Sequence, residues 1–286
     1  MGNFENCFDT PVIYKGVEIN CATLADDYYS IKSASESLIV NQLKDKDIDL
    51  LQLPYLTYIF KKGEQDENFK ILLDMMKYIV SVSFRKYATI ILEDSLLIYE
   101  PTKEHDQYKN EYLSIIEEMQ LGLEQGKETR DLLELREKVL ALEKKIYKEY
   151  RFNCADFDNI RYIICELNGI DTTVYDPRWE KKLIEARKLK NENYHSEENL
   201  TISDLVKNLA FYLKRLPQEL KNMSILTFDH YIKLMQDFEE YKLNRSAELQ
   251  GTEFKQKIIH WIRHYKPQGK YDDVLSKNSA AFDSVE

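Results

Sequence analysis

Glycine and proline are scarce in this chain of 286 residues. Eight glycines and six prolines make up about 5% of the sequence, where roughly 12% is average. Because both residues interrupt regular structure, their scarcity favours long helices. The glycines also form no Gly-x-x-x-x-Gly-Lys, Gly-x-Gly-x-x-Gly or Gly-x-Ser-x-Gly motif, the common signatures of phosphate-binding loops and serine hydrolases. The sequence therefore predicts a protein that is not an enzyme.

Long apolar runs and an excess of basic charge are missing as well. Runs such as Thr89–Leu92 are far shorter than the roughly 20 apolar residues of a membrane helix. Forty lysines and arginines against fifty acids leave a net charge of −10, which argues against a protein that grips phosphate backbones. Hydrophobic residues nevertheless make up 43% of the chain, too large a share for a disordered protein. We expect a folded protein that binds neither membranes nor nucleic acids.

Cysteine and histidine are too few and too scattered to predict a metal site. The four cysteines are Cys7, Cys21, Cys154 and Cys165. None are spaced as Cys-x-x-Cys, so we expect reduced thiols in a core rather than ligands or nucleophiles. His260 and His264 would share one face of a helix, but zinc needs further ligands and no glutamate follows His260. We therefore expect no metal and no cofactor.

One acidic stretch, Asp45-x-Asp47-x-Asp49, is similar to the beginning of a calcium-binding loop. Such a loop needs glycine at its sixth position and glutamate at its twelfth, and those positions hold Leu50 and Leu56. Acidic residues are also enriched at the first turn of a helix, where the helix dipole favours negative charge. We expect the second role.

The pattern of apolar residues predicts a mainly α protein with one or two small β-hairpins in its N-terminal third. Val12–Ile19 surrounds a Lys-Gly turn, and Tyr87–Tyr99 contains two β-branched runs joined by two acidic residues. The later sequence has almost wholly helical spacing. We divide the chain into an N-terminal region with the hairpins (1–102), a helical connector with coiled-coil-like spacing (103–152), a C-terminal helical domain (153–265) and a flexible tail (266–286).

Two predicted helices carry apolar stripes suited to binding a partner helix. The first helix spans Thr129–Tyr150 and is charged on its other faces. The second spans Thr227–Tyr241 and is rich in aromatic residues. The predicted partner-binding residues are Leu132, Leu135, Val139, Leu142, Ile146, Phe228, Tyr231 and Met235.

Several segments resemble structural and assembly proteins of phages that infect Gram-positive hosts. The similar segments are Phe157–Cys165, Tyr175–Glu180, Leu226–Asp229, Leu249–Gly251 and His260-Trp261. The opening Val12–Ile19 is similar to the short N-terminal hairpin of phage tail assembly chaperones. The chain is longer than most such chaperones and has an additional helical middle, and no functional residue is transferred from the family.

This resemblance implies a non-enzymatic protein that binds other virion components. In the chaperone family the client is the tape measure protein, whose long apolar helices need covering before the tail tube encloses them. The alternatives are a virion building block, such as a connector or baseplate part that forms a symmetric oligomer, a helical enzyme without a recognisable motif, and a phage inhibitor of host defence. We expect the protein in the cytoplasm of a bacterial host cell or in the virion.

Overall fold

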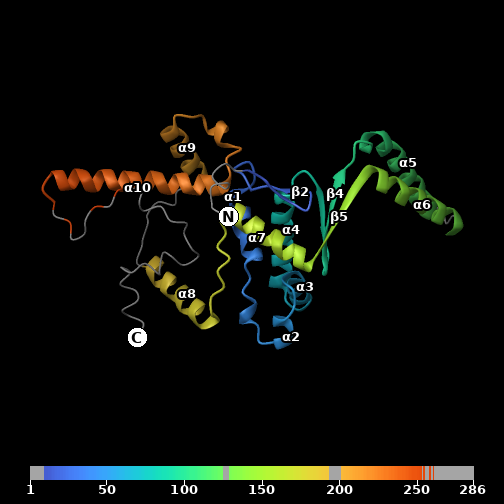
Figure 1. Cartoon of the computed structure of the whole chain (residues 1–286), viewed down its shortest axis with the longest axis horizontal. Helices are drawn as coiled ribbons and strands as arrows, with labels where there is room; N and C mark the ends of the chain where they lie inside the picture. Colours follow the sequence, from blue (N-terminus) through green and yellow to red (C-terminus); the bar gives the residue numbers. More distant parts are fainter. Residues whose placement is uncertain are drawn as a thin grey trace.

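The computed structural model describes residues 10–124, 129–192 and 201–252, together with residues 254, 258 and 260. Within these residues the fold is mainly α, as predicted, with two small antiparallel sheets (Figure 1). The helices are α1 (Tyr28–Ser35), α2 (Ile48–Leu51), α3 (Tyr55–Gln65), α4 (Glu67–Ser83), α5 (His105–Glu124), α6 (Thr129–Ile146), α7 (Cys154–Leu167), α8 (Pro177–Glu192), α9 (Ile202–Leu213) and α10 (Ile225–Leu249). The strands are β1 (Val12–Tyr14), β2 (Val17–Ile19), β3 (Ala88–Ile91), β4 (Ser95–Pro101) and β5 (Tyr147–Asn153).

The first predicted hairpin is confirmed. Strands β1 and β2 pair in antiparallel fashion around Lys15 and Gly16, whose φ angles are 47° and 86°. Two successive residues with positive φ are typical of the two-residue turn that matches the twist of a hairpin, and glycine adopts it without strain. The Tyr14 hydroxyl donates to Asp156 Oδ1 at 2.9 Å, and Lys15 Nζ lies 2.6 Å from the same oxygen. The hairpin is thereby fastened to the beginning of α7.

The second predicted hairpin is also confirmed, but it belongs to a larger sheet. Strands β3 and β4 pair in antiparallel fashion, and β5 pairs with the other edge of β4, from Ser95 opposite Asn153 to Pro101 opposite Tyr147. The prediction of a helix over Thr129–Tyr150 is wrong at its end, because α6 stops at Ile146. The aromatic residues in β5 favour a strand. The edge of β4 provides the backbone hydrogen bonds that residues 147–150 would have made within a longer α6.

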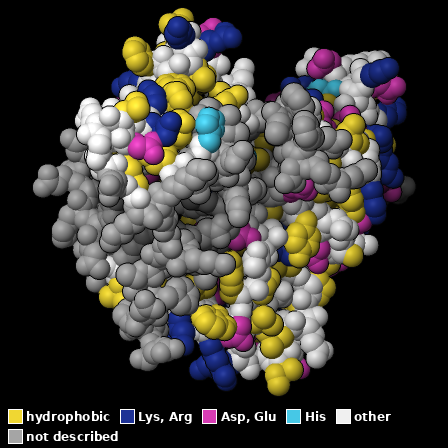
Figure 2. Space-filling model, turned by 60° about the vertical axis from the view of Figure 1, so that its left-hand side comes forward, with side chains coloured by type: hydrophobic (Ala, Val, Ile, Leu, Met, Phe, Trp, Pro, Cys, Tyr) yellow, Lys and Arg dark blue, Asp and Glu magenta, His cyan; other side chains and the backbone are white. Residues whose placement is uncertain are grey.

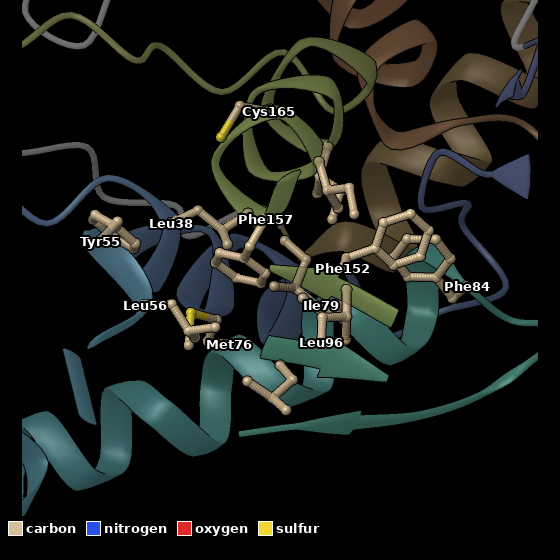
Figure 3. Packing of buried hydrophobic residues seen from close by; sticks show 14 of the residues in the cluster. Leu38, Tyr55, Leu56, Met76, Ile79, Phe84, Leu96, Phe152, Phe157 and Cys165 are labelled. Atoms are coloured by element: carbon tan, nitrogen blue, oxygen red, sulfur yellow. The ribbon is translucent and has the colours of Figure 1, made fainter. Parts of the chain in front are cut away.

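The main core lies between this sheet and the helices α3, α4 and α7 (Figure 3). The buried side chains come from both sides of the predicted domain boundary at 152/153. They include Leu56, Met76, Ile79, Phe84, Leu96, Phe152, Phe157 and Ile164. That boundary therefore divides a single core, and the N-terminal region is completed by β5 and α7. The predicted tail, 266–286, lies outside the described residues.

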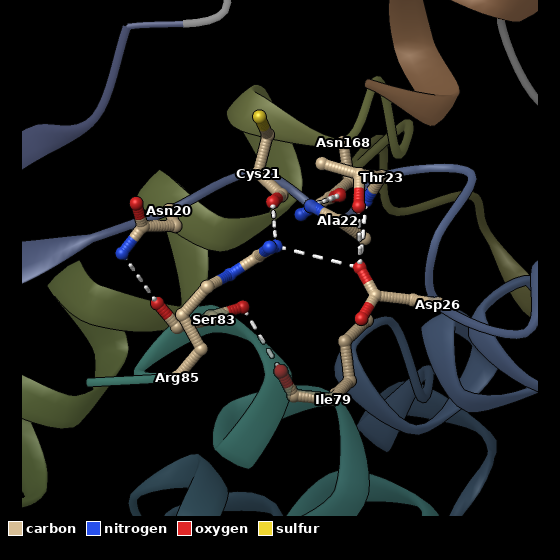
Figure 4. Close-up of polar contacts among 9 residues, drawn as sticks. All are labelled: Asn20, Cys21, Ala22, Thr23, Asp26, Ile79, Ser83, Arg85 and Asn168. Carbon is tan, nitrogen blue, oxygen red and sulfur yellow. Dashed lines mark hydrogen bonds and ion pairs between the residues drawn. The ribbon is translucent and has the colours of Figure 1, made fainter. Parts of the chain in front are cut away.

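A polar junction joins the N-terminal segment to α7 (Figure 4) and also to the start of α10. Asn168, the residue that ends α7, accepts a hydrogen bond from the backbone N–H of Ala22 at 2.9 Å and donates one to the carbonyl of Ile164 at 2.8 Å. The carbonyl of Ala22 in turn accepts from the backbone N–H of Ile225 at 3.0 Å. Arg85 donates to the carbonyl of Cys21 at 2.6 Å. These bonds satisfy backbone groups that the sheet and helices leave unpaired.

Helices α9 and α10 form a second apolar layer around buried Leu209, Leu220 and Phe228. A capping box starts α9, as the sequence predicts: the Thr201 hydroxyl accepts from the backbone N–H of Asp204, whose carboxylate accepts from the N–H of Thr201. Asp229 on α10 accepts hydrogen bonds from the Tyr28 hydroxyl at 2.9 Å and from Lys32 Nζ at 2.6 Å. The layer is thus fastened to α1.

Helices α5 and α6 form an antiparallel pair that we call the arm. Figure 1 shows it at one end of the molecule, joined to the body by β4 and β5. At its root, the backbone N–H of Thr102 donates to the carbonyl of Ile146 at 2.8 Å. Further along, the Tyr112 hydroxyl donates to Glu143 Oε1 at 3.1 Å. The arm occupies most of the predicted connector 103–152, and it is an insertion between two neighbouring strands.

Candidate functional site

The first predicted partner-binding stripe lies inside the arm. Four of its five residues are buried, namely Leu135, Val139, Leu142 and Ile146, and Leu132 is half-buried. Their cover is α5, whose side chains face α6 along the arm. The amphipathic spacing therefore marks packing within the chain, and a partner reaches this stripe only if α5 separates from α6. As an exposed docking surface, the stripe is a wrong prediction.

The second predicted set divides between core and surface. Phe228 is buried beneath α9. Met235 is half-buried at the edge of the same cluster, while Tyr231 is 41% exposed. Of the three residues, Tyr231 presents most of its surface to a partner.

Tyr231 belongs to an aromatic surface on the seam between α9 and α10. Phe238 follows it seven residues later, which places both rings on the same side of α10. From α9, the ring of Tyr212 meets that of Phe238, with 6.4 Å between their centroids and an edge-to-face angle of 74°. We call Tyr212, Tyr231, Met235 and Phe238 the aromatic surface. Figure 2 shows hydrophobic side chains gathered at the top of the molecule, over α9 and α10.

An open cleft of about 690 Å³ lies beside the other side of α9. Its apolar wall comes from the segment before α1, from α9 and from the turn that follows it. The wall includes Leu24, Tyr28, Ile202, Val206, Pro217 and Leu220. The pKa of the Tyr28 hydroxyl is raised, first by burial and then by the neighbouring Asp229 carboxylate. A neutral tyrosine in an apolar cleft suits packing rather than proton transfer.

A second, more polar cleft of about 610 Å³ lies beside α3, α4 and α8. Glu180 is only 3% exposed; its Oε2 lies 2.9 Å from Lys44 Nζ and accepts from Asn41 Nδ2 at 3.0 Å. In the same cleft, Asp45 Oδ2 lies 2.7 Å from Lys62 Nζ. Each carboxylate therefore pairs with its own lysine. The Glu180–Lys44 pair joins α8 to the segment before α2, and the Asp45–Lys62 pair joins that segment to α3.

The charges of this cleft set the pKa values around it. The hydrogen bond from Lys62 holds the pKa of Asp45 below its ordinary value. Burial, together with the Asp45 carboxylate, raises the pKa of Tyr58 to about 12.

Asp47 caps α2 by accepting from the N–H of Asp49 at 3.0 Å. Asp47 and Asp49 therefore have the helix-start role expected from the sequence, whereas Asp45 pairs with Lys62.

Acid should weaken the Asp45 contact. Because the folded-state pKa lies below the unfolded value of about 3.9, the contact stabilises the fold fully above about pH 4, and this stabilisation is lost as the pH falls through the folded pKa. Asp45→Asn should lower the free energy of unfolding at pH 7 and make its fall between pH 4 and pH 2 shallower. Urea unfolding across this range measures both. Asp74→Asn, which removes a 67% exposed carboxylate paired with Lys77, should leave the slope unchanged.

The thiols and histidines form no reaction centre in the described part of the chain. Cys21 and Cys165 are buried and Cys154 is half-buried, all three as free thiols. Burial raises the pKa of the Cys165 thiol to about 12, so it stays protonated and unreactive at neutral pH. The ring of His260 lies 5.1 Å from that of Tyr241. Cys7 and His264 lie outside the described residues, among which no three His, Cys, Asp or Glu side chains gather as a metal site would require.

Comparisons with known protein families, with characterised proteins and with solved structures find no match to this chain. In the described ranges no helix is long and apolar enough to cross a bilayer. The aromatic surface combines exposed rings from two helices, Tyr212 of α9 and Tyr231 of α10. Sequence reasoning found its α10 half from helical spacing, but it missed Tyr212, because nothing local indicates that this residue of α9 meets Phe238.

Proposed function

We propose that the protein is a non-enzymatic phage assembly factor, similar to a tail assembly chaperone, that binds an apolar helix of another virion component. The observation that carries the proposal is the aromatic surface, where Tyr212 and Tyr231 remain 42% and 41% exposed. Tyrosine is enriched where proteins bind one another, because its ring is apolar and its hydroxyl tolerates water. The resemblance to phage assembly proteins names the client as the tape measure protein.

The shape of the site suits a helical client. Tyr231 and Phe238 follow one side of α10 for two turns, and Tyr212 adds one ring from α9 beside Phe238. Apolar groups presented by two adjacent helices can contact the stripe of an amphipathic helix. The net charge of −10 favours solubility while the hydrophobic client is held. In this proposal the complex forms in the cytoplasm of the bacterial host.

The test is binding to the tape measure protein encoded in the same phage genome, produced together with this chain. Wild-type protein should keep the client soluble, and Tyr231→Glu or Tyr212→Glu should weaken binding at least tenfold, the equivalent of about 1.4 kcal/mol. Isothermal titration with a client fragment measures the affinity. Phe211→Glu is the matched control, since Phe211 adjoins Tyr212 in sequence and is 87% exposed.

Two outcomes would contradict the proposal. One is a wild-type protein that neither binds nor solubilises the tape measure protein. The other is an equal loss of affinity in Phe211→Glu and Tyr212→Glu, which would show that added negative charge anywhere on α9 acts, rather than loss of the aromatic surface.

A further inference from the structure

The arm exposes leucines that its own packing does not use. Away from the tip, Leu113 on α5 and Leu133 and Leu140 on α6 are 47%, 52% and 48% exposed, and Leu121 and Leu123 are exposed in the last turn of α5. The seam between the two helices is already filled by the buried α6 stripe and by half-buried residues of α5 such as Tyr112. Leu113, Leu133 and Leu140 are therefore apolar surface beyond what holds the arm together.

Helix geometry places these leucines on the same broad side of the arm. Successive residues of a helix are turned by about 100° around its axis. Measured from the direction that faces the other helix of the arm, Leu113 on α5 and Leu140 on α6 each lie roughly 120° around their own helix, and both are turned in the same sense. Because α5 and α6 are antiparallel, the same sense of rotation brings both to one side. Leu133 precedes Leu140 by seven residues, or about 20° of rotation. The hydrogen bond between Tyr112 and Glu143 sets Leu113 and Leu140 at similar heights.

The opposite broad side of the arm is charged. The same geometry places on it Glu111, Glu118, Glu134, Lys138 and Lys145. The leucine side also carries charged residues, among them Lys109, Glu117, Arg136 and Glu143, so its three exposed leucines are what set it apart. The leucine side is therefore the one suited to contact with another protein.

We propose that the leucine side of the arm binds the leucine side of a second copy of this chain, forming a four-helix bundle with both tips pointing the same way. In this arrangement α5 of each copy lies against α6 of the other. Leu113 then faces Leu140 of the second copy at the same height. The proposal concerns a different surface from the α9–α10 seam and does not depend on the proposed function.

Charge selects a second copy in this orientation. Helix α5 carries five carboxylates against one lysine, a net charge of −4, while α6 carries five basic residues against four acids, a net charge of +1. Pairing α5 with α6 of the second copy sets opposite charges against each other. It also brings Glu117 within about one turn of the second copy's Arg136, and Lys109 within about one turn of its Glu143.

The reversed orientation, with the tips pointing in opposite directions, lacks this complementarity. The two acidic α5 helices would then face each other. With the leucines aligned, Arg136 would also lie close to Arg136 of the second copy near the two-fold axis. Like charges set opposite each other disfavour this pairing.

The first test is the mass of the purified chain by sedimentation equilibrium. We expect a dimer of the 34.0 kDa chain. Leu140→Glu should raise the dimer dissociation constant by about 100-fold or more, because a carboxylate would be buried at the interface in both copies. Ala141→Glu adds the same charge one residue later, on an exposed position turned toward the other side, and should leave the dimer intact. Circular dichroism and thermal unfolding verify that both variants fold.

The second test is charge reversal, which distinguishes the two orientations. Arg136→Glu and Glu117→Arg should each raise the dissociation constant about three- to tenfold, and the double variant should restore it. A dimer that Arg136→Glu strengthens would contradict the proposed orientation. A monomeric wild-type chain, including one whose arm binds only another protein, would overturn the proposal, and so would a dimer unaffected by Leu140→Glu.

Discussion

Phe157→Ala is expected to lower the free energy of unfolding by about 3–5 kcal/mol, the usual cost of removing a buried aromatic ring. Phe157 lies in the middle of the main core, fully buried on α7 between α3 and the three-stranded sheet (Figure 3). Its loss removes contacts and leaves a cavity that the close-packed neighbours fill only in part. Urea unfolding followed by circular dichroism measures the change, with the dependence on urea concentration expected to stay the same.

Phe211→Ala provides the control for this experiment. It deletes the same ring from a position that is 87% exposed, so the free energy of unfolding should change by no more than about 0.5 kcal/mol. If the two variants lose the same stability, the core does not lie where the structure places it.

Asn168→Ala is expected to cost about 2–3 kcal/mol. The substitution leaves the N–H of Ala22 buried without its acceptor and removes the bond donated to the carbonyl of Ile164. A buried polar group without a partner costs roughly 1–3 kcal/mol, and the residue also ends α7. Since Ala22 is bonded to Ile225 as well, the loss should loosen the attachment of α10, which hydrogen exchange at Ile225 detects.

Asn159→Ala is the matched control for Asn168→Ala. It makes the same change on the same helix, but Asn159 is exposed, and its amide donates to the carbonyl of Ala155 and to the Tyr14 hydroxyl. Alanine is the better helix former at such a position, so stability should remain within about 0.5 kcal/mol. If both variants lose the same free energy of unfolding, the buried hydrogen bonds of Asn168 contribute no more to stability than the exposed ones of Asn159.

Local signals were enough to predict those elements whose causes lie close together in sequence. The turn at Lys15 and Gly16 and the cap at Thr201 each depend on contacts within a few residues. Strand β5 was not predictable in this way. It is extended because it pairs with the edge of β4, and α5 and α6 separate the two strands in sequence. A long-range pairing thus overrides a local helical pattern.

The candidate sites show the same limit. Periodicity correctly indicated that Leu135, Val139 and Leu142 lie on one stripe, but it does not say whether a partner or the same chain covers that stripe, and here the cover is α5. The meeting of Tyr212 with Phe238 depends on how two helices pack. Exposure of Leu113 and Leu140 likewise follows only once the seam between α5 and α6 is known.

The position of the arm between β4 and β5 has a consequence for how the sheet forms. Bringing Pro101 to Tyr147 in an unfolded chain means closing a long loop, whose entropic cost grows with its length. Because α5 and α6 are antiparallel and similar in length, the beginning of α5 and the end of α6 lie next to each other at the root of the arm. Once the arm has paired, β4 and β5 begin as neighbours at Thr102 and Ile146, and the sheet can close from that end like a hairpin with a very short turn.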